Sequence, residues 1–301
     1  MSTAMLAIII PAYKRRFLSR TLDSIAAQSC QDFTLYIGDD ASPEDLYSIV
    51  QPFEGKLSLR YHHFDENLGG KDLVAHWERC LRMTQNEQWV LLFSDDDTMP
   101  PDAVERFYAK MEVFPGKKFF RFPLSRIDEN DGVEYPGDGL PNGIQSAEGM
   151  LLDYFEGKRP SAACEYVFAR ELFEQEAMIH FPLAWCSDVA TWYRYASLSD
   201  GVVNIPGAPV CWRNVSNSNI SNTSGLQGRK MRALIEFMCW LGKHYTGKRD
   251  RRFRRALYAY VKCNLSISFE GIFSRKDLIS LTGALLCISP SVALRILFKY
   301  Y

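Results

Sequence analysis

The sequence lacks the closely spaced cysteine pairs from which most structural zinc sites are built. Its eight cysteines lie singly, and no C-x-x-C pair occurs among them. A cysteine-based metal site is therefore not expected. The N-terminus also lacks a signal-peptide pattern, because its apolar stretch runs directly into a charged segment. Free thiols without an export signal predict a reducing, cytoplasmic location.

Long apolar runs and an appreciable net charge are missing as well. The best apolar segment, LISLTGALLCI at 278–288, has eleven residues, whereas a membrane-spanning helix needs about 20. The formal net charge is −1, so no overall field favours nucleic acid as a partner. A chain of 301 residues is long enough for one large α/β domain or two smaller ones.

The first hundred residues alternate apolar, strand-like runs with segments of helical periodicity. Strands are predicted at 6–12, 33–39, 57–64 and 89–95, with helices at 17–29 and 71–84. This alternation is typical of a doubly wound α/β sheet of mostly parallel strands. In such sheets ligands bind beyond the carboxyl ends of the strands. Ser42-Pro43-Glu44-Asp45 additionally predicts a helix start, with Ser42 as the N-cap.

The rest of the chain divides into two parts. Residues 115–222 are rich in Gly, Pro and Asn and mix short strands with loops, and a helical pattern begins at 225. We therefore expect one main domain over 1–222, with a nucleotide-binding half at 1–110 and an acceptor-side half at 111–222. A helical C-terminal extension over 223–301 is expected to follow.

Polar clusters stand where the predicted strands end or the next helix begins, and the acidic triplet Asp95-Asp96-Asp97 is the sharpest of them. Three adjacent carboxylates repel one another, so a cation nearby would stabilise them. Magnesium commonly takes one or two protein carboxylates together with substrate phosphates. The alternative is a solvated acidic turn before the helix that opens near Pro100.

Two further clusters have both a functional and a structural interpretation. Asp39 and Asp40 could accept from a nucleobase N–H or could cap a helix, and Ser42 already fills the predicted cap. Lys71 follows the glycine pair of ENLGG, where backbone N–H groups favour anions, so it could reach a phosphate. Considered without the other polar clusters, Lys71 is more simply interpreted as a solvated surface lysine.

In combination these clusters resemble the nucleotide-binding half of family 2 glycosyltransferases with the GT-A fold. IIIPAYKR resembles the family's opening strand and turn, LYIGDDAS its V-D-D-x-S element, ENLGG its N-x-G element, and LLFSDDDTMPPDAV its D-x-D strand end. The resemblance covers about the first 110 residues. It implies a metal-dependent transferase of bacterial polysaccharide or cell-envelope type that uses a nucleotide-sugar donor.

The resemblance also implies roles for individual residues. Donor contacts would come from Pro11, Ala12, Tyr13, Arg15, Asp39, Asp40, Asn67, Lys71, Asp95 and Asp96 in the first half and from Arg213 in the second. A Mn²⁺ or Mg²⁺ ion would be held by Asp97 and Asp95. Ser94 stands where the family usually has an aspartate, so the resemblance leaves open which of the three carboxylates touches the metal.

The second half resembles the family at two shorter segments. SDVATWYR at 187–194 resembles the family's E-D-x-x-L-W-L-R helix. The resemblance implies that Asp188 is the catalytic base, and Ser187 stands where the family usually has a glutamate. VCWRNVSNSNIS at 210–221 resembles the R-x-x-x-x-S-x-S loop near the pyrophosphate. An inverting transfer needs a base to take the proton from the acceptor hydroxyl. The leaving diphosphate would be stabilised by the metal with Lys71 or Arg213.

Trp185 and Asp188 each have a plain structural alternative. Trp185 could stack on an acceptor sugar or could be a core tryptophan. Asp188 could be an N-cap as well as the base, and Glu165 and Asp200 are the carboxylates to consider next.

The tail carries a separate signal. GKRDRRFRR at 247–255 has six basic residues in nine positions, and an apolar stretch that ends in aromatic residues follows at 278–301. This combination favours peripheral contact with an anionic membrane on its inner face, and the alternative is a solvated basic helix. A lipid-linked or glycan acceptor is expected from the resemblance.

The sequence is also compatible with two other functions. A sugar nucleotidyltransferase would open with a glycine-rich phosphate loop, whereas PAYKRR has no glycine. A catalytically inactive nucleotide-sugar-binding protein would bind the donor without turnover.

Overall fold

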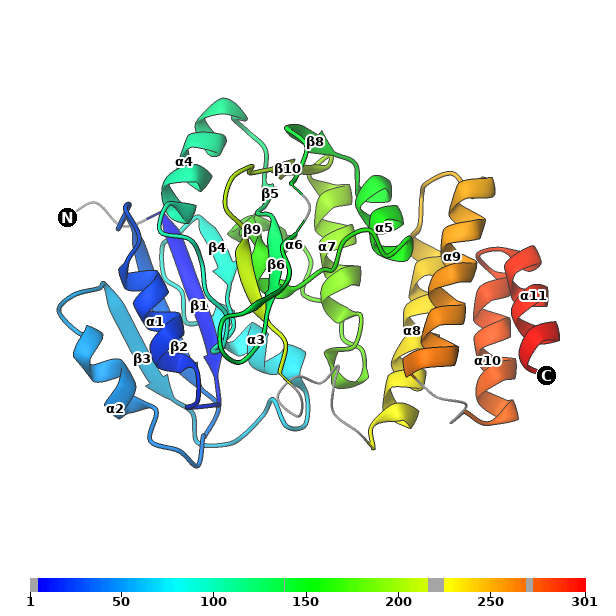
Figure 1. Cartoon of the computed structure of the whole chain (residues 1–301), viewed down its shortest axis with the longest axis horizontal. Helices are drawn as coiled ribbons and strands as arrows, with labels where there is room; N and C mark the ends of the chain where they lie inside the picture. The colour runs from blue at the N-terminus through cyan, green and yellow to red at the C-terminus, as the bar shows by residue number, and fades with distance from the viewer. Residues whose placement is uncertain (1–4, 138, 216–224, 269–272) are drawn as a thin grey trace. The chain divides into compact units, whose positions relative to one another are not determined.

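The computed structural model describes residues 5–137, 139–215, 225–268 and 273–301 (Figure 1). These residues cluster into two compact units. Unit 1 comprises 1–147, 161–178 and 194–215, and unit 2 comprises 148–160, 179–193 and 216–301. Residues 148–160 and 179–193 therefore group with the C-terminal helices, although they lie within the predicted main domain.

Unit 1 is built on a sheet whose described strands have the order β3-β2-β1-β4-β9-β5-β10-β8. The strands are β1 Leu6–Ala12, β2 Phe33–Asp39, β3 Leu59–His63, β4 Trp89–Leu92, β5 Phe119–Arg121, β8 Gly143–Gln145, β9 Tyr166–Ala169 and β10 Val202–Asn204. The first four are parallel, and β9 pairs antiparallel with both β4 and β5. A smaller sheet of order β11-β6-β7 contains β6 Leu124–Ile127, β7 Val133–Tyr135 and β11 Val210–Arg213.

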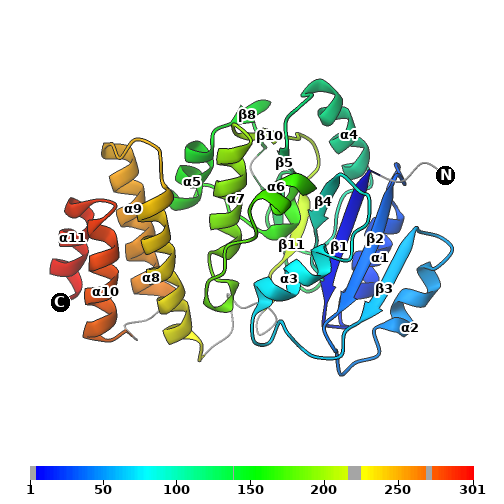
Figure 2. The same ribbon diagram turned by 180° about the vertical axis from the view of Figure 1, so that it is seen from behind.

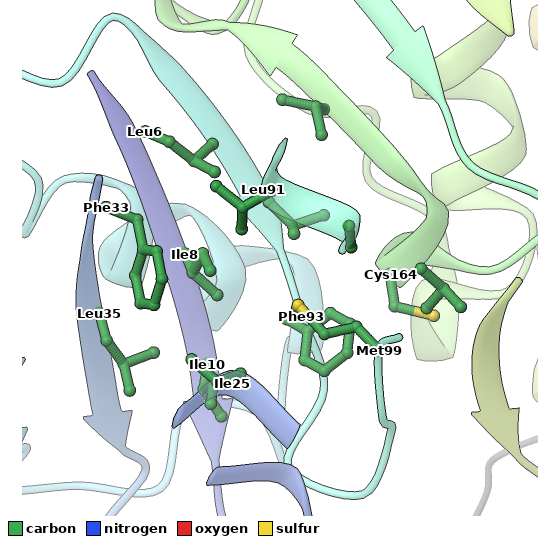
Figure 3. Packing of buried hydrophobic residues seen from close by; sticks show 14 of the residues in the cluster. Leu6, Ile8, Ile10, Ile25, Phe33, Leu35, Leu91, Phe93, Met99 and Cys164 are labelled. Atoms are coloured by element: carbon green, nitrogen blue, oxygen red, sulfur yellow. The ribbon is translucent and has the colours of Figure 1, made fainter. Parts of the chain in front are cut away.

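Helices cover both faces of the parallel part of this sheet (Figures 1 and 2). They are α1 Leu18–Ala26, α2 Tyr47–Val50, α3 Leu73–Leu81, α4 Ala103–Val113 and, further along the chain, α6 Arg170–Gln175. Leu6, Ile8 and Ile10 of β1 lie in one buried cluster with residues of α1, and Ile25 of α1 lies beside Ile10 (Figure 3). Alternate side chains point to the opposite face, where α3 packs on β1 and β2. Each fully buried aliphatic side chain contributes about 1.5–3 kcal/mol, so this core fixes the strand ends that carry the polar clusters.

The observed bounds of β1 and β2 are those that the apolar runs predict. The predicted helix start at Ser42 is wrong, because α2 begins at Tyr47 and Ser42 does not cap it. Ser42 Oγ instead donates to the Tyr13 carbonyl at 2.7 Å and accepts from Glu44 N at 3.2 Å. The hydroxyl therefore ties the turn after β2 to the turn after β1.

Unit 2 is helical, which confirms the expected helical C-terminal extension. It contains α8 Gln227–His244, α9 Arg251–Cys263, α10 Arg275–Leu286 and α11 Pro290–Tyr300, together with most of α5 Ala147–Phe155 and the first half of α7 Ser187–Leu198. α9 shows why these helices associate. Phe253, Leu257 and Val261 recur at helical spacing and are fully buried, while the arginines between them are exposed. α8–α11 lie side by side in both views (Figures 1 and 2).

Candidate active site

The acidic triplet follows β4 at the carboxyl edge of the parallel strands. Asp95 and Asp96 are 8% exposed and Asp97 is fully buried, so the interpretation as a solvated acidic turn is wrong. Asp95 Oδ2 accepts from the backbone N–H groups of Tyr13 and Lys14, each at 2.8 Å. Because β1 and β4 are adjacent, this carboxylate fastens the turn after β1 to the end of β4.

Hydrogen bonds satisfy the buried carboxylates of Asp97 and Asp96 less completely than they satisfy that of Asp95. Asp97 Oδ1 accepts from Arg213 N at 2.9 Å, whereas Oδ2 is buried without a hydrogen-bond partner within the described ranges. Burial raises the pKa of Asp97 to about 6, and hydrogen bonds from Arg213 N and from the side chains of Cys164 and Ser94 to the carboxylate oppose this rise. Burial, followed by the charges of Asp97 and Asp95, raises the pKa of Asp96 well above its usual range. Buried carboxylates of this kind are costly unless a cation or a proton joins them.

A divalent cation fits this donor set as an ion completed by other ligands. No group of three or more His, Cys, Asp or Glu side chains that could hold a metal occurs in the described part of the chain. Magnesium and manganese prefer oxygen ligands, and magnesium often takes only one or two protein carboxylates plus substrate phosphates. The unpartnered Asp97 Oδ2 supplies such a ligand, and a bound diphosphate would supply the others.

Arg213 lies against the triplet rather than in solvent. Its side chain is fully buried; Nε donates to the Asp96 carbonyl at 2.8 Å, and the terminal nitrogens donate to the Asp128 carbonyl at 2.7 Å and Asp131 Oδ1 at 2.6 Å. The guanidinium also stands 4.5 Å from the Phe17 ring centroid. In this arrangement Arg213 links the triplet to the 128–131 turn. The remainder of the predicted pyrophosphate loop, 216–221, lies outside the described residues.

Asp39 and Asp40 organise the neighbouring loops from the end of β2. Asp39 accepts from Ser42 N at 2.8 Å, and Tyr61 Oη also donates to it. Asp40 accepts from the backbone N–H groups of Leu68 and Gly69 at 2.8 and 2.9 Å. The ENLGG segment is therefore held against the end of β2 by a buried carboxylate.

Sequence reasoning missed the cation that accompanies Asp40. Arg79 of α3 forms an ion pair with it, and Arg79 Nε donates to His76 Nδ1 at 2.9 Å. Burial lowers the pKa of His76 to about 4, so the ring is neutral and accepts from the guanidinium. The i, i+3 spacing of His76 and Arg79 places them on one face of a predicted helix. This spacing was the feature of the sequence from which their contact could have been predicted.

The other predicted donor residues lie at the rim of the same edge. Pro11 is partly buried and Ala12 fully buried at the end of β1, while Tyr13 is 39% exposed. Asn67 Oδ1 accepts from Gly70 N at 2.6 Å. The two predicted rim cations both have partners: Lys71 Nζ lies 3.1 Å from Glu66 and Arg15 donates to the Asp45 carbonyl at 2.6 Å.

In unit 2, Asp188 lies in the first turn of α7. Its Oδ1 accepts from Val189 N at 2.8 Å, and burial raises its pKa to about 6. A position near a helix N-terminus lowers a carboxylate pKa, so desolvation is the larger effect here. Trp185 is partly buried, and Lys230 Nζ stands 5.0 Å from its ring centroid, so one face of the indole already carries a cation.

Glu165 and Asp200, the two alternative candidates for the base, lie in very different environments. Glu165 is buried in unit 1, accepts from Ala162 N at 3.1 Å, and has a pKa raised by burial to about 7. The Asp200 side chain is fully exposed and pairs with Lys117 at 3.0 Å. Asp200 therefore lacks the desolvated setting that tunes a carboxylate toward base catalysis near neutral pH.

Comparisons with known proteins agree with this architecture. The model of glycosyl transferase family 2 matches residues 7–116. Validoxylamine A glucosyltransferase from Streptomyces hygroscopicus subsp. jinggangensis is 35% identical over 68 residues, which cover 22% of this chain and 16% of that protein. The match thus spans about a sixth of this curated relative.

Solved structures resemble the chain over nearly its whole length. TarS 1–349 of S. aureus in complex with UDP-GlcNAc has a TM-score of 0.72 at 13% identity, covering 98% of this chain and 88% of that one. The mannosyltransferase PcManGT from Pyrobaculum calidifontis in complex with GDP-Man and Mn²⁺ has a TM-score of 0.53 at 14% identity, covering 98% and 86%.

The chain therefore has the GT-A fold of these glycosyltransferases, with the acidic triplet at the carboxyl edge of its parallel strands. The similarity to glycosyl transferase family 2 lies in residues 7–116, which hold β1 to β4 and the acidic triplet.

Proposed function

We propose that this protein is an inverting transferase that moves a sugar from a nucleoside-diphosphate sugar to a hydroxyl of a glycan or lipid-linked acceptor. The observation that carries the proposal is the buried carboxylate edge after β4, where Asp97 Oδ2 has no donor among the described residues and Asp96 has a strongly raised pKa. The structural neighbours TarS and PcManGT, solved with UDP-GlcNAc and GDP-Man, support a nucleotide sugar as the donor.

The donor would lie across the ends of β1, β2 and β4. Tyr13 is exposed enough to contact the base, and Pro11 and Ala12 form the backbone beside it. Asp39, Asp40, Asn67 and Asp95 would act mainly by fixing the loops around the nucleoside, since their oxygens already accept from backbone N–H groups.

The metal, Mn²⁺ or Mg²⁺, would be held by Asp97 through Oδ2, with Asp95 contributing the oxygen that Tyr13 and Lys14 leave free. Mn²⁺ in the PcManGT structure supports a divalent ion. When bound, such an ion neutralises the triplet and stabilises negative charge on the leaving diphosphate. Arg213 would keep the triplet in place, because its backbone N–H donates to the Asp97 carboxylate and its Nε donates to the Asp96 carbonyl.

Asp188 would take the proton from the acceptor hydroxyl as its oxygen attacks the anomeric carbon and the bond to the diphosphate breaks. Attack from the face opposite the leaving group inverts the anomeric configuration. A base whose pKa is near the working pH accepts a proton more effectively than an ordinary aspartate while remaining ionised at neutral pH. Trp185 would contact the acceptor through the ring face that Lys230 does not cover.

Release of the nucleoside diphosphate tests this proposal. Purified protein is incubated with Mn²⁺, a mixture of short glycan acceptors, and each of a panel of UDP-, GDP-, dTDP- and ADP-sugars. Acceptor-dependent release from one donor, with the product anomer inverted by NMR, is expected. A retained anomeric configuration would contradict the assignment of Asp188, and nucleotide binding without release would favour an inactive sugar-binding protein.

The pH dependence of turnover follows from the raised pKa of Asp188. The base must be ionised, so activity should be full above the pKa and should fall as the pH drops through about 6. We expect an acidic limb of kcat with a midpoint near pH 6, measured between pH 4.5 and 9 at saturating donor and acceptor. A midpoint near 4 would mean that the working base is an ordinary solvated carboxylate.

We also propose peripheral membrane contact through unit 2. No helix in the described ranges is long and apolar enough to cross a membrane. A cavity of about 1170 Å³ on unit 2 is lined mainly by basic side chains, among them Arg251, Arg254, Arg255 and Arg295. Several large apolar side chains are exposed on α10, α11 and the C-terminal residue, namely Ile279, Leu286, Leu294, Phe298 and Tyr301. A surface that binds anionic lipid typically combines basic residues with exposed apolar ones, and unit 2 carries both kinds.

Replacing Arg251, Arg252, Arg254 and Arg255 by glutamine should weaken binding to vesicles containing phosphatidylglycerol. Each basic residue near an anionic surface contributes about 1 kcal/mol, although Arg252 should contribute less because Glu156 already pairs with it at 2.8 Å. The matched control neutralises four basic residues elsewhere on unit 2, namely Arg229, Arg232, Lys243 and Lys276. Failure of the unaltered protein to sediment with these vesicles at low salt would rule out the contact.

A further inference from the structure

The turn that leads into Asp188 has an unusual backbone. Leu183, Ala184 and Cys186 have φ values of 63°, 54° and 66°, and none of them is a glycine. Residues with a side chain adopt this left-handed region only when the surrounding structure holds them there, and such positions cluster at functional sites. The backbone just before the proposed base is therefore held in place by its neighbours.

Unit 2 supplies the contacts that hold this turn. Phe181 N donates to Ser187 Oγ at 2.9 Å, which closes the turn at the start of α7. Cys186 Sγ lies 3.3 Å from Tyr260 Oη of α9, and Tyr260 Oη lies 3.5 Å from Tyr154 Oη of α5. The Tyr260 ring packs on Phe155, with 4.7 Å between their centroids. Two helices from distant parts of the chain thus meet at Cys186.

Asp188 depends on this turn for its position. No side-chain donor among the described residues holds its carboxylate, which accepts from the backbone N–H of Val189. Burial raises the pKa of both Cys186 and Tyr154, and the nearby charge of the Asp188 carboxylate adds a smaller increase to each. A carboxylate that is oriented only by its own backbone moves whenever that backbone moves.

We propose that Tyr260 is a positioning residue for Asp188, acting through its hydroxyl contact with Cys186. The proposal rests on Asp188 being the base of the proposed transfer. In this proposal α9 contributes to catalysis indirectly, because it fixes the backbone conformation of the turn that precedes Asp188. Tyr154 completes the contact by placing a second hydroxyl beside that of Tyr260.

Tyr260→Phe tests the proposal, because it keeps the ring packing and removes the hydroxyl. We expect kcat to fall about tenfold, since small displacements of a reacting group are costly. The melting temperature and the dissociation constant for the donor should change little. Tyr258→Phe is the matched control: it makes the same change on the same helix, and the hydroxyl of Tyr258 has no hydrogen-bond partner among the described residues. Cys186→Ala should lower kcat similarly, whereas Cys186→Ser, which can still bond to Tyr260, should retain most of it.

A double-mutant cycle separates positioning from general stabilisation. In the Asp188→Asn background, Tyr260→Phe should have no further effect on the residual rate, because there is no base left to position. The same tenfold loss in that background, or an unchanged kcat in Tyr260→Phe alone, would overturn the role of Tyr260. Near-normal turnover in Asp188→Asn alone would instead mean that the proposed function has the wrong base.

Discussion

Asp188→Asn is expected to lower turnover by about 10²–10⁴-fold while leaving donor affinity nearly unchanged. The asparagine keeps the shape of the side chain and can still accept from Val189 N, but it cannot take a proton. General-base catalysis typically contributes a factor of this size. Steady-state rates at saturating donor and acceptor, together with a donor binding isotherm, measure the two effects separately.

Asp200→Asn is the matched control for this change. The Asp200 side chain is fully exposed and pairs with Lys117, so its replacement should leave the rate close to that of the unaltered protein. Loss of donor binding together with turnover in Asp188→Asn would show that Asp188 has a structural role instead. Turnover near normal would move the base elsewhere, with Glu165 as the buried carboxylate to test next.

Asp97→Ala should abolish most transfer, and chelation by EDTA should do the same to the unaltered protein until Mn²⁺ or Mg²⁺ is returned. Loss of a metal that stabilises a leaving diphosphate costs several kcal/mol of transition-state stabilisation, or about 10²–10³-fold in rate. Asp23→Ala, which removes an exposed carboxylate on α1, should leave the rate unchanged. Full activity in EDTA would contradict the metal assignment.

A second substitution, Asp97→Asn, tests whether the protein stays folded when the Asp97 charge is removed. The pKa of Asp97 is raised in the folded state by burial, so its ionised form destabilises the folded chain above about pH 6. Asp97→Asn removes that charge while nearly preserving volume. Its melting temperature at pH 8 without ligand should therefore equal or exceed that of the unaltered protein, as is common when a functional charge is removed.

Periodicity and strand-end chemistry predicted much of unit 1. The runs LAIIIPA and FTLYIGD gave β1 and β2 with their observed bounds, because a strand buried on both faces shows as a continuous apolar run. Parallel pairing then places Ala12 opposite Asp39, so the polar residues that follow had to gather at one edge. The start of α2 was missed because Ser42 bonds to Tyr13, a contact between distant turns that local capping rules do not contain.

The partners of the site residues were much harder to predict. The sequence indicates that Asp40 stands at a strand end, but its contact with Arg79 depends on how α3 packs. Arg213 was predicted to face the pyrophosphate, and its complete burial against Asp96, Asp97 and Asp131 follows from the path of the 128–131 turn. The contact between Cys186 and Tyr260 joins residues 74 positions apart. Such contacts are set by tertiary packing, which residue spacing does not encode.

The measurement that tests the central claim most directly is a thermal-shift comparison of UDP, GDP, ADP, dTDP and CDP, each with Mn²⁺ and with EDTA. A ligand present at a hundred times its dissociation constant adds about 2.7 kcal/mol to stability, which is visible as a higher melting temperature. We expect one of these nucleotides to stabilise the unaltered protein in Mn²⁺, and this effect to disappear in EDTA and in Asp97→Ala. Stabilisation that is equal in Mn²⁺ and EDTA, or absent for all five nucleotides, would contradict a metal-assisted nucleotide site at the end of β4.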